Sequence, residues 1–237
     1  MGLGQSQGLT VDSVKAKLAA TALFSIIDRE PKVTFIAPPA GAAHPPARAA
    51  GAVSFRGVKL VYPGRKDAAP ALDGITLDIA PGSLVALVGS SGSGKSSLFA
   101  LLERFYEPSA GAVLLDGVDV RTLPLAYTRS QIALVLQEPS LFSESVAFNV
   151  GFPDVETGDA AALKASPDCQ KAAAAAGAAD FVEAMPDKFS TKCGTRGSQL
   201  SGGQKQRLCI ARALARNAPI ILLDEATSVS ASAKRGG

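Results

Sequence analysis

Residues 89–97, GSSGSGKSS, constrain the fold of this chain more than any other stretch. They follow a continuously apolar run at residues 83–89, which is typical of a parallel strand buried on both faces. A helical pattern follows the loop and continues to Tyr106. The stretch fits G-x-x-x-x-G-K-[ST] in the strand–loop–helix context that this motif requires. We therefore expect an α/β fold with the loop at the carboxyl end of a central parallel strand.

The same loop predicts a site for a nucleoside triphosphate. Its glycines let successive backbone N–H groups face phosphate oxygens, and the helix that follows adds the positive end of its dipole. We expect Lys95 to reach the β- and γ-phosphates and the Ser96 hydroxyl to bind Mg²⁺. An ordinary Gly/Ser loop is the alternative, which the complete motif in its required context disfavours. The residues expected to bind the cofactor ATP here are Gly89, Ser90, Ser91, Gly92, Ser93, Gly94, Lys95, Ser96 and Ser97.

A second apolar run, residues 220–223, leads directly into the carboxylates Asp224 and Glu225. We expect this run to be a buried strand as well. A carboxylate at the end of a strand beside the phosphate loop is where a second Mg²⁺ ligand belongs, so Asp224 is the predicted metal ligand. Glu225 is the predicted general base that polarises the attacking water. Without the phosphate loop upstream, a solvated pair of carboxylates would be the better interpretation.

Composition narrows the function classes. A net charge of +3 over 237 residues is too small to indicate a nucleic-acid partner, and we expect none. The three cysteines form no C-x-x-C pair, which argues against a disulfide framework and a zinc site. The only histidine, His44, lies in a Pro/Ala-rich stretch without the partners of a metal site. No run approaches the roughly 20 apolar residues of a membrane-spanning helix.

The remaining elements follow from periodicity. Apolar residues at three- and four-residue spacing predict a helix over residues 10–30, followed by a linker rich in Pro and Ala. Strand patterns occur at residues 53–62, 75–79, 112–117 and 132–137. The alternation in the first of these slips at Gly57, which predicts a β-bulge. Ala-rich stretches between residues 143 and 194 predict a helical insertion.

Residues 199–207, QLSGGQKQR, begin a helix, with Ser201 as N-cap and Gln204 completing a capping box. Placed between the phosphate loop and residues 220–225, this stretch closely resembles the signature motif of ATP-binding cassette (ABC) ATPases. Residues 187–214, DKFSTKCGTRGSQLSGGQKQRLCIARAL, resemble the B-type, multidrug-resistance exporters in particular. The resemblance covers roughly residues 50–228.

The resemblance assigns further residues. Tyr62 matches the aromatic residue on which this family stacks adenine, although an ordinary tyrosine on an edge strand would give the same pattern. Gln137 matches the glutamine that touches Mg²⁺ and the attacking water. The signature residues of one chain are expected to contact the γ-phosphate held by the other chain, and they are Ser201, Gly202, Gly203 and Gln204.

The family also implies an organisation and partners. Residues 1–35 resemble the tail of the last transmembrane helix and its connecting helix, residues 36–52 a linker, and residues 53–228 the nucleotide-binding domain. The expected fold is a P-loop NTPase core with an antiparallel β subdomain and a helical insertion that carries the signature motif. The expected partners are a second nucleotide-binding domain, arranged head to tail, and the transmembrane domains of an exporter. The protein is then membrane-associated on the cytosolic face, through domains that this chain lacks.

The match ends abruptly after Ser228. Where the family continues with A-L-D, this chain has Val229, Ser230 and Ala231, and no histidine follows His44. The family's loop aspartate, its switch histidine and its C-terminal strand are therefore missing from the sequence, and we expect a chain truncated at both ends. Residues 229–237 are a divergent tail.

Three alternatives follow from these patterns. The missing groups favour weak ATP turnover by the isolated chain, so a nucleotide-binding regulatory partner without hydrolysis is one alternative. A DNA-associated ATPase with the same cassette is another, but it requires coiled-coil heptads, which the sequence lacks. The opening MGLGQS fits a myristoylation pattern at Gly2, although the tail of a membrane helix explains it as well.

Overall fold

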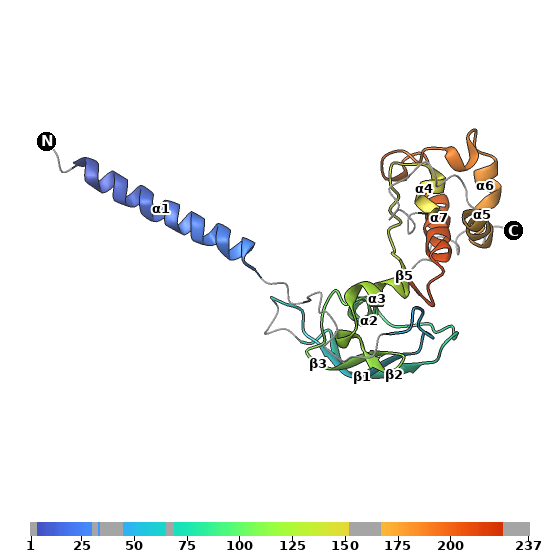
Figure 1. Ribbon diagram of the computed structural model, residues 1–237, viewed down its shortest axis with the longest axis horizontal. Helices are drawn as coiled ribbons and strands as arrows, with labels where there is room; N and C mark the ends of the chain where they lie inside the picture. Colours follow the sequence, from blue (N-terminus) through green and yellow to red (C-terminus); the bar gives the residue numbers. More distant parts are fainter. Residues whose placement is uncertain (1–3, 30–32, 34–44, 65–68, 152–166, 225–237) are drawn as a thin grey trace. The chain divides into compact units, whose positions relative to one another are not determined.

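The computed structural model describes residues 4–29, 33, 45–64, 69–151 and 167–224. The chain divides into two units, Met1–Thr34 and Phe35–Gly237 (Figure 1). The first unit contains helix α1 (Gly4–Ile27), which confirms the predicted helix and starts it six residues earlier. Residues 13–29 of this unit are exposed. Among the described helices, none has the length and apolar character needed to cross a membrane.

The second unit begins with a four-stranded antiparallel sheet in the order β2-β1-β3-β4. Its strands are β1 (Val53–Leu60), β2 (Leu72–Ile79), β3 (Ala110–Leu115) and β4 (Val118–Asp119). The register of β1 against β2 shifts between Phe55 and Val58, and Gly57 has φ of 58° there. The predicted bulge is therefore confirmed. The antiparallel sheet contributes to one hydrophobic cluster, together with α2 (Lys95–Leu102).

A group of helices forms around a second hydrophobic cluster (Figure 1). The helices are α4 (Val146–Gly151), α5 (Pro167–Ala175), α6 (Ala179–Glu183) and α7 (Gly202–Ala215). Arg212 of α7 joins this group by donating to the Asn149 carbonyl and to Asn149 Oδ1, both at 2.7 Å, and to the Ser140 carbonyl at 3.1 Å. The predicted helical insertion is therefore confirmed for the part of it that the structure describes. Short 3₁₀ turns precede α7 at Lys188–Ser190 and Thr195–Gly197, and another lies at Val120–Thr122.

Strands β5 (Ile132–Val135) and β6 (Ile220–Leu223) form a separate parallel pair. In the chain, β5 follows α3 (Leu125–Ser130) and β6 follows α7. Side chains of β5 alternate between the two hydrophobic clusters. Ile132 belongs to the cluster of the antiparallel sheet, whereas Ala133 and Val135 belong to the cluster of the helices. This alternation is the period-2 pattern of a strand with both faces covered.

The predicted buried strand at residues 83–89 is wrong. The structure assigns no strand to this segment, and Leu84 and Val88 are 99% and 94% exposed. The predicted burial of 220–223 on both faces is also wrong, because Ile221 and Leu223 of β6 are 42% and 44% exposed. A continuously apolar strand needs neighbours on both edges and cover on both faces. Within the described residues, β6 pairs only with β5, so neither run receives that environment.

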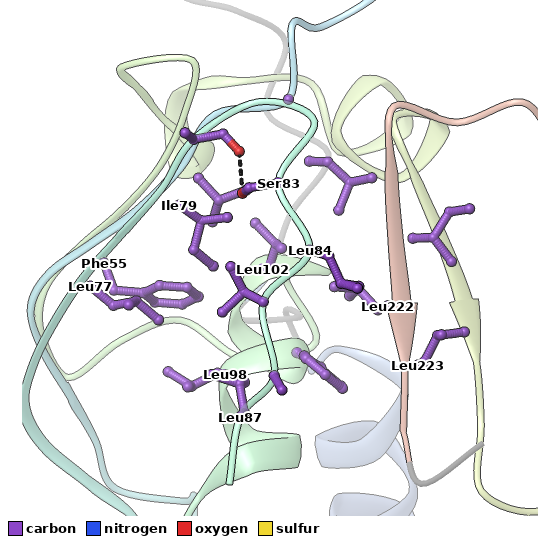
Figure 2. Close-up of a pocket in the computed structure, with 18 of the residues that line it drawn as sticks. Phe55, Leu77, Ile79, Ser83, Leu84, Leu87, Leu98, Leu102, Leu222 and Leu223 are labelled. Atoms are coloured by element: carbon purple, nitrogen blue, oxygen red, sulfur yellow. Dashed lines mark hydrogen bonds between the residues drawn. The ribbon is translucent and has the colours of Figure 1, made fainter. Parts of the chain in front are cut away.

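A cavity of about 430 Å³ lies beside this extended segment. Figure 2 shows Leu84 and Leu87 of the segment opposite side chains from the antiparallel sheet, α2 and β6. Lys95 and Asp224 also line the cavity, so it borders the predicted nucleotide site. The labelled side chains that line it are Phe55, Leu77, Ile79, Ser83, Leu84, Leu87, Leu98, Leu102, Leu222 and Leu223.

Candidate nucleotide site

The phosphate loop turns into α2 at Gly94, where only glycine fits. Gly94 is the N-cap of α2 and has φ of 92° and ψ of 8°, a left-handed conformation that other residues adopt at a cost. A Cβ atom at this position would lie 2.6 Å from Leu72 Cδ2 and 2.8 Å from the Ala71 carbonyl oxygen. The close approach of β2 to the loop therefore requires the second motif glycine.

Lys95 donates hydrogen bonds to the backbone of the phosphate loop. Its ammonium donates to the carbonyls of Gly89 at 3.0 Å and Ser90 at 2.9 Å, and lies 3.4 Å from Ser93 Oγ. These contacts place a positive charge among residues expected to bind phosphates. Because Lys95 is the first residue of α2, it also lies at the positive end of the helix dipole.

The two predicted metal ligands lie together. Ser96 Oγ donates a hydrogen bond of 2.9 Å to Asp224 Oδ2, although 128 residues separate them in sequence. The Asp224 amide donates to the Val135 carbonyl at 2.9 Å, which extends the β5–β6 pairing by one residue and fixes the carboxylate at the strand end. The structure therefore brings together two side chains that the sequence singled out through two separate motifs, and their role as metal ligands stays a prediction.

One of the two predicted catalytic residues, Gln137, lies within the described residues and follows the end of β5. Gln137 is exposed and lies two residues beyond β5, as Asp224 lies one residue beyond β6. The carboxyl ends of parallel strands meet at one edge of a sheet, so Gln137 and Asp224 share that edge. Glu225 lies outside the described residues.

Tyr62 is half-buried beside the start of α2. Its hydroxyl and that of Ser97 share a hydrogen bond of 2.8 Å. Its ring makes an edge-to-face contact with the Tyr106 ring, with centroids 4.9 Å apart and planes at 89°. The sequence pointed to Tyr62 and Ser97 separately, but it missed their hydrogen bond and the contact of Tyr62 with Tyr106. No periodicity or motif links these residues in the sequence.

The signature stretch begins α7 as predicted. Ser201 Oγ accepts from the Gln204 amide at 3.3 Å, and Gln204 Oε1 accepts from the Ser201 amide at 2.9 Å, which confirms the capping box. A Cβ atom at Gly202 would meet nothing within 4 Å. The first turn of α7 therefore presents backbone to open space at Gly202, which suits contact with an anion.

The chemistry of the oxygen donors fits Mg²⁺. Among the described residues no group of three His, Cys, Asp or Glu side chains comes together. Mg²⁺ is commonly held by one or two carboxylates, with water and substrate phosphates as the other ligands, and Ser96 with Asp224 supplies such a partial set. Burial raises the pKa of the Cys193 and Cys209 thiols, so both stay protonated at neutral pH.

A glycine-rich loop at the start of a helix, a lysine within the loop, and a hydroxyl–carboxylate pair at a strand end define a phosphate-loop nucleotide-binding protein. The comparisons with known proteins identify the family. The family model described as "ABC transporter" matches residues 72–228. This chain belongs to the ABC transporter family, and its fold is the α/β nucleotide-binding fold of that family with an antiparallel sheet and a helical insertion.

The proteins similar to this chain include a B family transporter, a flippase and an exporter. The chain is 45% identical, over 96% of its length, to "ABC transporter B family member 2" of Dictyostelium discoideum, and covers 16% of that protein. It is 51% identical, over 77% of its length, to an "ATP-dependent lipid A-core flippase" of Thiobacillus denitrificans and covers 30% of it. A solved structure of a bacterial Atm1-family ABC exporter with ATP bound matches 94% of this chain at a TM-score of 0.76 and 34% identity, and the match covers 36% of that exporter chain. This chain therefore spans a sixth to about a third of the curated relatives named here.

Proposed function

We propose that this chain is the nucleotide-binding domain of a B-type exporter and binds Mg-ATP at residues 89–96. The observation that carries the proposal is the 2.9 Å hydrogen bond between Ser96 and Asp224. It places an oxygen pair suited to Mg²⁺ beside a loop whose lysine and backbone N–H groups suit phosphates. Mg²⁺ bound there would neutralise phosphate charge.

The proposed hydrolysis assigns one task to each side chain. Lys95 leaves the carbonyls of Gly89 and Ser90 for the β- and γ-phosphates and offsets their charge. Gln137, at the strand edge that Asp224 shares, orients the attacking water. Glu225, the neighbour of Asp224 in sequence, accepts the proton from that water as general base.

The proposed partners are those that the resemblance to ABC exporters implies. Two such domains would close head to tail, so that Ser201, Gly202, Gly203 and Gln204 of one contact the γ-phosphate at the loop of the other. The free backbone at Gly202 supports this arrangement. Closure and hydrolysis would drive export through transmembrane domains, and the domain would sit at the cytosolic face of the membrane. Residues 1–35 would connect to the last transmembrane helix, residues 36–52 would form the linker, and the domain proper would span residues 53–228.

Calorimetric titration with ATP, with and without Mg²⁺, tests the metal pair. Asp224→Asn and Ser96→Ala should each remove about tenfold or more of the Mg²⁺-dependent gain in ATP affinity, because each removes an interaction with a charged group. Ser91→Ala, in the same loop, is the matched control and should retain that gain, because its proposed contact is through the backbone. An unchanged Mg²⁺ dependence in both ligand variants would contradict the proposal.

A second candidate function is a nucleotide-binding partner that does not hydrolyse ATP. It is favoured by Val229, Ser230 and Ala231, which replace the loop sequence expected for the family. Phosphate release measured beside a complete partner domain separates the two functions. ATP binding without phosphate release under those conditions would favour the regulatory function over turnover.

A further inference from the structure

Tyr106 lies on a rigid turn at the end of α2. The amides of Phe105 and Tyr106 donate to the Ala100 carbonyl at 2.8 and 3.4 Å, and Arg104 has φ of 53°, so the chain reverses direction immediately after the helix. The Arg104 side chain is buried and donates to the Leu123 carbonyl at 2.9 Å. The position of Tyr106 is therefore set by the backbone and by a buried anchor.

This turn brings the Tyr106 ring against Tyr62. The two rings meet edge to face, at 4.9 Å between centroids and 89° between planes, which is a favourable arrangement for aromatic pairs. Tyr62 itself lies in an irregular segment after β1, where the backbone alone gives its side chain little restraint. Its ring also packs against the hydrophobic cluster of the antiparallel sheet, and its hydroxyl is bonded to that of Ser97. The hydroxyl bond and the ring contact come from opposite ends of α2, because Ser97 lies in its first turn and Tyr106 lies just beyond its last residue.

A Tyr62 ring fixed in this way is suited to stacking. Ser97 follows Lys95 and Ser96 directly, so the Tyr62 hydroxyl is bonded within the first turn of the helix that begins at the phosphate loop. Tyr62 also packs against the hydrophobic cluster of the antiparallel sheet but is only half-buried, so part of its ring is accessible. A base stacked on the accessible part would meet an aromatic ring that is already ordered, and ordering in advance improves affinity.

We propose that Tyr106 is a positioning residue for nucleotide recognition, which acts by holding the Tyr62 ring in place for the base. The inference rests on the proposed function and adds a residue to it. Because stacking uses the π-face that every base has, Tyr106 contributes to binding of a nucleotide and not to binding of its phosphate chain alone.

Isothermal titration with Mg-ATP and with Mg-tripolyphosphate tests this directly. Tyr106→Leu should weaken ATP binding about 2- to 10-fold, the range expected for loss of an aromatic pair. Its tripolyphosphate affinity should stay at the wild-type value, which also shows that the loop is folded. Tyr106→Phe keeps the ring and should keep the ATP affinity. Phe105→Leu is the matched control, because Phe105 is exposed and lies under Arg129 instead of Tyr62.

A double substitution tests whether Tyr106 affects ATP affinity through Tyr62. In a Tyr62→Leu background, Tyr106→Leu should cause no further loss of ATP affinity, because its contact is already gone. Fully additive losses, or equal losses for ATP and tripolyphosphate, would overturn the positioning role. Wild-type binding of tripolyphosphate and ATP with equal affinity would overturn it as well, while leaving the phosphate loop in place. Failure of the wild-type chain to bind either ligand would instead refute the proposed function.

Discussion

Alanine at Gly94 should destabilise the chain much more than alanine at Gly92, although both glycines lie in the phosphate loop. Both have positive φ, 92° at Gly94 and 82° at Gly92. A left-handed conformation costs a residue with a side chain about 1–2 kcal/mol, and both variants carry this term. The two positions differ in their surroundings, and this difference gives the expected result.

A Cβ atom at Gly92 would meet nothing within 4 Å. At Gly94 it would lie 2.8 Å from the Ala71 carbonyl oxygen and 2.6 Å from Leu72 Cδ2, and the first of these atoms belongs to backbone that cannot rotate away. Forcing extra atoms into such a site costs about 1–3 kcal/mol more. The expected loss of unfolding free energy is therefore about 2–5 kcal/mol for Gly94→Ala and about 1–2 kcal/mol for Gly92→Ala.

Urea denaturation followed by circular dichroism measures this difference. With a slope of about 2 kcal/mol per molar urea, the midpoint of Gly94→Ala should lie about 0.5–1.5 M below that of Gly92→Ala. The m-value should be the same in both variants, which shows that the native surface buried is unchanged. Equal midpoints would refute the argument that the approach of β2 selects glycine at this position.

Two further predictions concern charged side chains. Arg212→Met should lower the unfolding free energy by about 3 kcal/mol, because it removes three hydrogen bonds from a charged donor, to the Asn149 carbonyl, to Asn149 Oδ1 and to the Ser140 carbonyl. Thermal denaturation measures this, and a loss below about 0.5 kcal/mol would contradict it. Burial acts to raise the pKa of Asp119, but hydrogen bonds and charge from Arg121 outweigh it and hold this pKa below its usual value. The pair therefore stabilises the fold above about pH 4, and that contribution disappears as the pH falls through the lowered pKa. Asp119→Asn should reduce stability at pH 7 but not at the acidic end of the titration, and an equal loss at both pH values would contradict the assignment.

The parts of the site that follow from local spacing were predictable from the sequence. The phosphate loop, the Ser201–Gln204 capping box and the bulge at Gly57 each depend on a few consecutive residues and their conformational preferences. The meeting of Ser96 and Asp224 was predictable despite their separation, because each motif assigns its residue to the same expected metal site, although the parallel strand expected at residues 83–89 is not formed. The roles of Gln137 and Glu225 stay predictions.

Other features depend on neighbours that the sequence pattern does not specify. The apolar run at residues 83–89 has the composition of a buried strand, but burial also requires strands on both edges, and Leu84 and Val88 lack them here. The contact of Tyr106 with Tyr62 depends on the left-handed turn at Arg104, an uncommon conformation for arginine that no local signal announces. Position in the fold, and not residue type, decided both outcomes.

The alternation of side chains along β5 has a consequence for cooperativity. Ile132 belongs to one hydrophobic cluster, and Ala133 and Val135 belong to the other. This four-residue strand therefore contributes side chains to both clusters. Loss of β5 would expose both cores at once, and the two clusters should therefore melt in a single transition. The same strand leads to Gln137, and its Val135 carbonyl accepts a hydrogen bond from the Asp224 amide. A shift of these residues on nucleotide binding would therefore be passed on to both hydrophobic clusters together.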